Sequence, residues 1–212
     1  MNNVGIVSLW TIVIVTIVYK KTVSIIIHHS FFIIDLVMKL IVGLWNPGKE
    51  YEITRHNIWF MIVNDFLKDG DWHMEYGKWK GEWQESIIGD QKVFFLKPME
   101  FMNRSWWAVW ALARFYKIEP KDILVIHDDI DLPVGKIQLK LWWSSAGHNW
   151  LKDIITVLGT KDFWRLRIGV DRPINQKYVA EYVLTPFKEE EKNLIDDKMN
   201  HIETHITTFL SS

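Results

Sequence analysis

The chain has 212 residues without a cysteine, and its 25 lysine and arginine residues nearly balance 26 aspartate and glutamate residues. This length suits one globular domain with a sizeable core, while the lack of cysteine excludes disulfide frameworks and thiolate metal sites and fits a reducing compartment. A net charge of −1 excludes a chain that is basic throughout, so any contact with nucleic acid has to come from a local patch.

Residues 1–37 differ from the rest of the chain because they are rich in isoleucine and valine and carry few charges. Residues 1–19 contain no charged side chain, are long enough to span a membrane and are followed by Lys20 and Lys21. Polar residues dilute this stretch, however, and it has neither a basic start nor a usual signal-peptide cleavage site. We expect residues 1–37 to be a non-native upstream extension and the domain to span residues 38–212, with a membrane anchor as the alternative.

An apolar run at residues 40–42 predicts a buried strand, which ends at a turn over residues 46–48. Proline fixes φ in this turn, and glycine allows a positive φ. Helical periodicity begins at Thr54 and stops before Gly70, which places His56 just inside a helix. A histidine beside the carboxyl end of a strand can act as a general base near neutral pH, although a lone histidine is more often structural.

The middle of the chain predicts a strand, a turn at residues 89–90 and a second, apolar strand at residues 93–96. A helix is predicted over residues 105–116, with the serine at its start as the N-cap. Met102 and Asn103 lie between this strand and this helix. Taken alone, Met102 suits core packing and Asn103 suits a turn or capping role.

Residues 123–126 form the next apolar strand, which runs directly into His127, Asp128, Asp129 and Asp131. Three carboxylates at a strand end can bind a divalent cation, because hard cations take oxygen ligands. The alternative is a solvated acidic turn, which composition alone favours.

Residues 136–141 alternate apolar and polar side chains, which predicts a half-buried strand. A loop follows, and Asn149 is expected to cap the next helix. The last helix is expected over residues 188–210, where apolar side chains recur at helical spacing. The alternation of strands and helices along the chain predicts an α/β fold, with polar sites at the carboxyl ends of the strands.

Two arginines, Arg165 and Arg167, alternate with apolar residues, so both guanidinium groups lie on one face of a predicted strand. With Lys140 and Lys152 they are candidates for contacts to phosphate groups. A solvated strand face without a ligand is the alternative.

Six motifs occur in a fixed order along the chain: LWNPG, YEITRHN, KPMEFMNRS, HDDIDLPVG, GHN and FWRLRIG. Together they resemble the bacterial peptidyl-tRNA hydrolase family, closely over residues 38–187 and loosely beyond. The resemblance implies a single α/β domain with a twisted, mixed but mostly parallel sheet and helices on both faces. It also implies hydrolysis of the ester between peptide and tRNA, which recycles tRNA from stalled translation. The enzyme would be a cytoplasmic monomer that uses neither a metal nor another cofactor and has no membrane partner.

The same resemblance assigns roles to individual residues. His56 would be the general base that takes a proton from water, and Asp128 would accept a hydrogen bond that orients His56. The implied substrate-binding set is Asn46, Tyr51, Asn57, Met102, Asn103, His148 and Asn149. The implied contacts to tRNA phosphates are Lys140, Lys152, Arg165 and Arg167. The family commonly has a basic residue where this chain has Gln138, which weakens the expected phosphate clamp.

Tryptophan is unusually frequent, with 13 residues against 11 glycines. Six of the tryptophans stand where the resembled family has glycine or another very small residue, namely Trp45, Trp59, Trp106, Trp142, Trp143 and Trp150. An indole permits neither a positive φ nor a close backbone approach at low cost. We interpret these positions as UGA codons that the source reads as glycine. The alternative is a noncatalytic RNA-binding relative whose tryptophans fill the cleft.

Overall fold

The computed structural model describes residues 15–19, 22–26, 37–44, 46, 48–66, 73–75, 81–99, 105–142, 145 and 148–212. The chain divides into two units, Met1–Val37 and Met38–Ser212. The first unit contains an antiparallel pair of strands, β1 (Val15–Tyr19) and β2 (Thr22–Ile26). None of the helices in the described ranges is long and apolar enough to cross a membrane. That residues 1–37 are a non-native extension stays a prediction.

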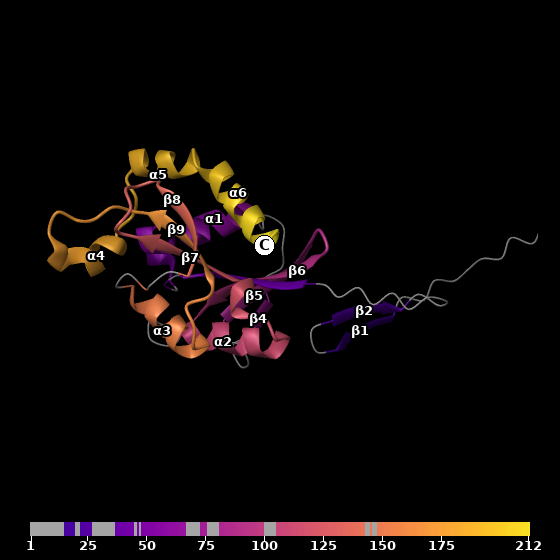
Figure 1. The fold of residues 1–212 in the computed structure, drawn as a ribbon. Coiled ribbons are helices and arrows are strands. Elements are labelled where there is room, and N and C mark those ends of the chain that lie inside the picture. The colour runs from indigo at the N-terminus through magenta and orange to yellow at the C-terminus, as the bar shows by residue number, and fades with distance from the viewer. Residues whose placement is uncertain are drawn as a thin grey trace, which may run out of the picture. The chain divides into compact units, whose positions relative to one another are not determined.

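The second unit is built on one seven-stranded sheet with the strand order β4-β5-β6-β3-β7-β9-β8 (Figure 1). In chain order, the strands are β3 (Val37–Gly43), β4 (His73–Glu75), β5 (Gly81–Ile88), β6 (Gln91–Pro98), β7 (Ile123–Asp129), β8 (Ile137–Leu141) and β9 (Trp164–Gly169). The central strands β3 and β7 are buried along nearly their whole length, as expected for apolar runs covered on both faces.

Parallel pairing occurs at the centre of the sheet, where β7 pairs with β3 and with β9. Strands β4, β5 and β6 pair antiparallel on one side, and β8 pairs antiparallel with β9 on the other. The two-residue turn at Gly89 and Asp90, where Gly89 has a φ of 63°, makes the β5–β6 pair a hairpin. The mixed α/β fold is therefore confirmed.

Helices cover both faces of the sheet (Figure 1). On one face, α2 (Ser105–Tyr116) and α3 (Asn149–Leu158) pack over the side chains of Leu40 and Val125. On the other face, α1 (Ile58–Phe66) and α6 (Met199–Leu210) pack over Ile41 and Leu124. Adjacent residues of a strand thus serve opposite cores, which is the period-two pattern of a buried strand.

Three local predictions differ from the structure. His56 lies in a short 3-10 helix, η2 (Arg55–Asn57), which precedes α1. The expected C-terminal helix is two helices, α5 (Glu189–Asp196) and α6, and a further pair, η4 (Gln176–Tyr178) and α4 (Val179–Val183), precedes them. Asn149 is the first residue of α3, whereas His148 occupies the N-cap position without a side-chain capping bond.

Candidate active site

The carboxyl ends of β3 and β7 lie together because the two strands are parallel, with Gly43 opposite Ile126. Asp128 therefore projects from the end of β7 close to the turn that follows β3. The chain returns to this edge in η2, whose Arg55, His56 and Asn57 are all buried. The sheet and one short 3-10 helix thus bring two residues together that are 72 positions apart in the sequence.

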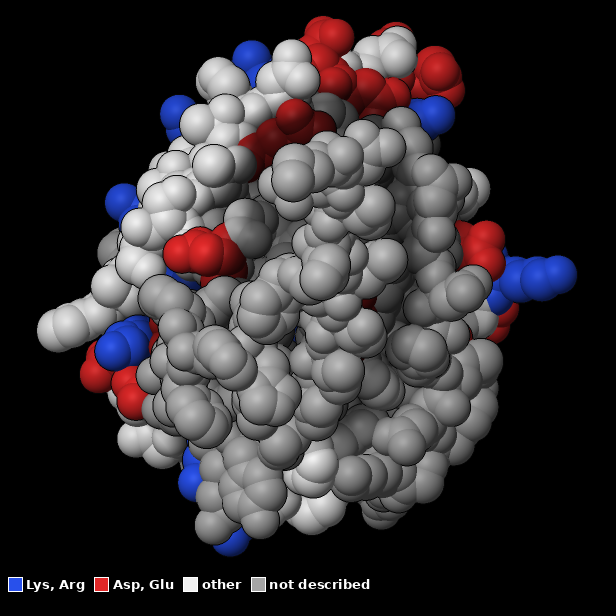
Figure 2. Space-filling model, turned by 90° about the vertical axis from the view of Figure 1, so that its right-hand side faces the viewer, with Lys and Arg blue, Asp and Glu red and all other residues white. Residues whose placement is uncertain are grey.

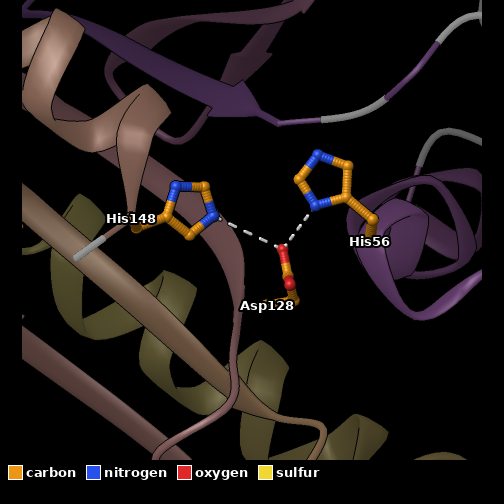
Figure 3. A group of neighbouring side chains, drawn as sticks. All are labelled: His56, Asp128 and His148. Atoms are coloured by element: carbon orange, nitrogen blue, oxygen red, sulfur yellow. Dashed lines mark hydrogen bonds and ion pairs between the residues drawn. The ribbon is translucent and has the colours of Figure 1, made fainter. Parts of the chain in front are cut away.

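His56 and Asp128 are joined by a hydrogen bond of 2.8 Å between Nδ1 and Oδ1, as the sequence predicts (Figure 3). Burial lowers the pKa of His56, but the charge and hydrogen bond of Asp128 outweigh burial and raise that pKa above its usual value. Burial opposes ionisation of Asp128, yet its contacts with His56 and His148 hold the pKa of this carboxyl well below its usual range. Asp128 is therefore a carboxylate at neutral pH, and the bond fixes a proton on Nδ1 of neutral His56.

The opposite nitrogen of His56, Nε2, is buried and has no hydrogen-bond partner within the described structure. With the proton of the neutral ring on Nδ1, Nε2 carries a lone pair. This arrangement is the one a general base requires.

His148 approaches the same carboxylate oxygen from the other side, with its Nε2 3.5 Å from Oδ1 of Asp128 (Figure 3). Its ring is stacked on that of His56 at a centroid distance of 6.0 Å. A third histidine, His127, donates from Nδ1 to the backbone oxygen of Asp128 at 2.6 Å. Burial and the nearby His148 lower the pKa of His127 to about 3, so its ring is neutral at physiological pH. Sequence reasoning missed His127, whose only signal was its place before Asp128.

Asn46 and Asn57 form a reciprocal pair beside His56. The backbone N–H of Asn46 donates to Oδ1 of Asn57 at 2.8 Å, and Nδ2 of Asn57 donates to the backbone oxygen of Asn46 at 2.9 Å. The side-chain oxygen of Asn46 is buried and has no hydrogen-bond partner in the part of the chain that the structure describes. Asn57 was expected to contact substrate, but its amide instead fixes the backbone of Asn46.

A cavity of about 530 Å³ opens beside His56 and Asp128. Its polar lining includes these two residues and His148, together with Asn149 from the start of α3. Helix α4 adds an apolar wall formed by Val179, Ala180 and Val183. A cleft with a few convergent polar groups and an apolar wall is the usual form of an enzyme site.

Comparison with known proteins gives a consistent answer. The model of the peptidyl-tRNA hydrolase family matches residues 40–212. The chain is 42% identical over 173 residues to a peptidyl-tRNA hydrolase of Lactobacillus gasseri, covering 82% of this chain and 93% of the relative. It is 46% identical to that of Bacillus cereus strain Q1, covering 73% of this chain and 83% of the relative. The chain belongs to the peptidyl-tRNA hydrolase family.

Solved structures agree with this assignment. A crystal structure of a peptidyl-tRNA hydrolase from Acinetobacter baumannii matches with a TM-score of 0.71 and 36% identity, covering 78% of this chain and 85% of that one. A methylthioadenosine nucleosidase from Arabidopsis thaliana, at 8% identity and a TM-score of 0.52, shares the fold alone. The resemblance that the six sequence motifs suggested is therefore confirmed.

Three predicted substrate residues remain, and only one of them lies in the described part of this peptidyl-tRNA hydrolase family member. Tyr51 is half-buried in η1 (Lys49–Tyr51), where its backbone oxygen accepts a bond from Thr54, and it does not line the cavity. Met102 and Asn103 lie outside the described residues.

The acidic residues after β7 do not act together as one cation site. Asp129 accepts a hydrogen bond of 2.7 Å from Nε of Arg167, and Asp131 is paired with Arg172. In the described part of the chain, the one group with metal-ligand spacing is His56, Asp128 and His148, whose ligand atoms lie within 4.8 Å of one another. That group coincides with the hydrogen-bonded pair of the active site.

Arg165 and Arg167, two of the predicted phosphate contacts, are both buried in this structure. They share the sheet face that α2 and α3 cover, and Arg167 is engaged by Asp129 and by Gln138. Arg165 lies over the ring of Phe163 at 4.2 Å, and its three guanidinium nitrogens have no hydrogen-bond partner among the described residues. Burial and the neighbouring Arg167 lower the pKa of Arg165 to about 10.

Lys140 and Lys152, the other two predicted phosphate contacts, are exposed. Figure 2 shows one face of the molecule, on which the basic side chains that are described stand apart from one another. Acidic side chains gather at the top of that face, at the height of α5 and α6. The part of this face that the structure describes thus has no continuous basic patch, in line with the balanced net charge.

Proposed function

We propose that this member of the peptidyl-tRNA hydrolase family hydrolyses the ester between a peptide and the terminal ribose of tRNA, with His56 as general base. The observation that carries the proposal is the 2.8 Å bond from Nδ1 of His56 to the buried carboxylate of Asp128, which leaves Nε2 unpartnered beside a cavity. Family membership supplies the substrate class. This geometry supports the residue roles.

In the proposed mechanism, Nε2 of His56 takes a proton from a water molecule as the water oxygen attacks the ester carbonyl carbon. The carbonyl oxygen becomes an oxyanion in the tetrahedral intermediate. When the bond to the ribose oxygen breaks, the imidazolium returns its proton to that leaving oxygen. Asp128 stabilises the imidazolium during this cycle and keeps the ring in the required tautomer.

Asparagine amides are suited to the other tasks of the reaction. Asn46, Asn103 and Asn149 each offer an N–H₂ group that can donate to the developing oxyanion and an oxygen that can orient the attacking water. Asn149 lines the cavity, whereas Asn46 is held by Asn57 and its side-chain oxygen has no partner among the described residues. Substrate contacts from Tyr51, Met102, Asn103, His148 and Asn149 remain part of the proposal.

The tRNA would be held through its phosphates, which requires exposed cations. Lys140 and Lys152 meet this condition, whereas Arg165 has to emerge from under its cover. A buried guanidinium without hydrogen bonds is costly, which favours such a rearrangement when a phosphate binds. We place the enzyme in the cytoplasm as a monomer that recycles tRNA from stalled translation without a metal or other cofactor.

Substitution of the proposed base tests this mechanism. His56→Ala is expected to lower turnover of peptidyl-tRNA by at least about 10²-fold, because water then has no base at Nε2. Circular dichroism and the melting temperature should show that the fold is intact. Near-normal turnover in this variant would remove His56 from the mechanism.

We also propose that the six tryptophans at small-residue positions are glycines in the native protein. Trp142 has a φ of 63°, a backbone conformation that suits glycine, and its side chain is 68% exposed. Trp59 and Trp150 are buried, and neither indole N–H finds a hydrogen-bond acceptor in the described structure. Each such N–H costs about 1–3 kcal/mol. Trp106 is half-buried in α2, and Trp45 and Trp143 lie outside the described residues.

One contact favours the second candidate function, a noncatalytic RNA-binding relative. The ring of Trp150 meets that of His56 edge-on at 5.4 Å and lines the cavity, where a large side chain reduces the space for a substrate. Two versions of the chain from Met38 onward separate the possibilities, one as printed and one with glycine at all six positions. Cleavage of peptidyl-tRNA by the glycine version alone supports both proposals. A printed version that is stable, binds RNA and never cleaves would support the binding protein instead.

A further inference from the structure

Arg55, which directly precedes His56, is a buried cation whose two terminal guanidinium nitrogens are both hydrogen-bonded. Its Nη1 donates to the backbone oxygens of Thr185 and Pro186, at 3.1 and 2.6 Å, and to Oγ1 of Thr185 at 2.6 Å. Its Nη2 forms an ion pair of 2.6 Å with Glu191. The guanidinium thus binds a segment more than 120 residues away in the sequence.

Backbone and aromatic contacts strengthen the same link. The backbone N–H of Arg55 donates to the oxygen of Thr185 at 3.1 Å, and Thr54 forms an isolated bridge with Pro186. The guanidinium also lies over the rings of Tyr182 and Phe187, at 4.4 and 5.3 Å. The 3-10 helix that carries His56 is therefore attached firmly to residues 182–191.

This distant segment is continuous with the apolar wall of the cavity. Helix α4 ends at Val183, two residues before Thr185, and its Val179, Ala180 and Val183 line the same cavity as His56. On the other side, Glu191 lies in the first turn of α5 and accepts a bond from the backbone N–H of Lys188. Arg55 therefore contacts the connection between the cavity wall and α5.

We propose that Arg55 is a positioning residue, which holds the α4 wall at a fixed place relative to His56. The inference rests on the proposed function, because the spacing matters only if a substrate lies between His56 and α4. A helix of five residues has little stability of its own, so its position depends on such external contacts. Misplacement of a substrate by about 1 Å can cost about 10²-fold in rate.

The chemistry of the contact requires arginine. Several acceptors converge on the two terminal nitrogens, and a planar guanidinium can serve them at once. A lysine in the same place keeps the charge but presents a single nitrogen, so some acceptors lose their donor. Arg55→Lys therefore weakens the attachment of η2 to residues 182–191. Glu191→Gln removes the charge of one partner of Arg55 and changes no residue of η2.

Lys39 provides a matched control. It is also a buried cation, and its Nζ donates to the backbone oxygens of Phe209 and Ser212 at 3.1 and 2.9 Å. It lies near the amino end of β3, whereas the cavity lies beyond the carboxyl ends of the strands. Lys39→Met should lower the melting temperature without changing the cavity.

The experiment measures kcat, KM and melting temperature with peptidyl-tRNA for the full chain and for the variants R55K, E191Q, K39M and H56A, using whichever residue set at the tryptophan positions is active. We expect R55K to lower kcat/KM by about tenfold or more, with most of the loss in KM, and E191Q to act in the same direction more weakly. We expect K39M to keep kcat/KM within about twofold despite a lower melting temperature. Amide exchange at residues 179–183 should accelerate in R55K and not in K39M.

Two outcomes are distinct. If R55K and E191Q lower only the melting temperature, as K39M does, and amide exchange in α4 is unchanged, the positioning role is overturned while the activity stands. If the parent chain does not cleave, or if H56A cleaves as fast as the parent, the proposed function itself fails.

Discussion

Buried polar groups near the two ends of strand β3 differ in whether they have hydrogen-bond partners. At the amino end, Lys39 reaches two backbone oxygens and lies 3.5 Å from the carboxylate of Asp122. At the carboxyl end, Nε2 of His56 and the side-chain oxygen of Asn46 are buried and find no partner in the described residues. An unpartnered buried group costs stability, so proteins keep such groups where a ligand will use them. The contrast supports the proposal that the chemistry takes place at the carboxyl end, whereas the amino end carries a structural contact.

Among the variants that test this contrast, Asp128→Asn is expected to have the largest effect on activity. An asparagine can donate to Nδ1 of His56 instead of accepting from it, which favours the wrong tautomer and removes the stabilisation of the imidazolium. We expect kcat to fall by about 10²–10⁴-fold. Single-turnover cleavage of peptidyl-tRNA measures the loss, and an unchanged far-UV circular dichroism spectrum serves as the control. A loss below about threefold would contradict the proposed role of Asp128.

The pH dependence of the reaction gives the next largest effect. Asp128 raises the pKa of His56 above its usual value, and only neutral His56 can accept a proton. We expect kcat/KM to fall about tenfold per pH unit below that pKa and to level off above it. In Asp128→Asn the residual activity should have its acidic limb at lower pH, because burial alone lowers the pKa of His56. An acidic limb that stays in place would show that another group controls it.

The buried, neutral ring of His127 is expected to make the fold less stable at acidic pH. Its pKa is about 3 in the folded chain and about 6.5 in an unfolded one, so the unfolded state binds more protons between these values. Stability therefore falls as the pH drops through this window. In His127→Gln, the difference in unfolding free energy between pH 7 and pH 4 should be smaller than in the parent. An unchanged difference in His127→Gln would contradict this assignment.

The smallest effect on activity is expected at the amino end of β3. Lys39→Met leaves two backbone oxygens and Asp122 without their donor, which should lower the unfolding free energy by on the order of 3 kcal/mol. Urea denaturation measures this loss, and kcat/KM should stay within about twofold of the parent. A selective loss of activity with normal stability would end the contrast between the two ends.

Local patterns were sufficient to predict the central strands, whereas the pairing of His56 with Asp128 came from the resemblance to the peptidyl-tRNA hydrolase family. The apolar runs at residues 40–42 and 123–126 could be recognised as buried strands because their side chains are apolar on both faces. That resemblance implied a hydrogen bond between His56 and Asp128, and Nδ1 and Oδ1 of these residues are found 2.8 Å apart.

The features that the sequence could not predict depend on which helices cover each face of the sheet. Arg165 and Arg167 alternate as an exposed strand would, yet they are buried because they share the sheet face that α2 and α3 cover. Likewise, Asn57 could not be told from a substrate ligand until the backbone of Asn46 lay beside it. Periodicity and turn residues are encoded locally, so the sequence by itself determined the strands and the ordered motifs, and the motifs carried the resemblance that paired His56 with Asp128. Contacts across more than a hundred residues, such as that of Arg55 with Thr185 and Glu191, arise only when the helices pack, and only the tertiary structure decided them.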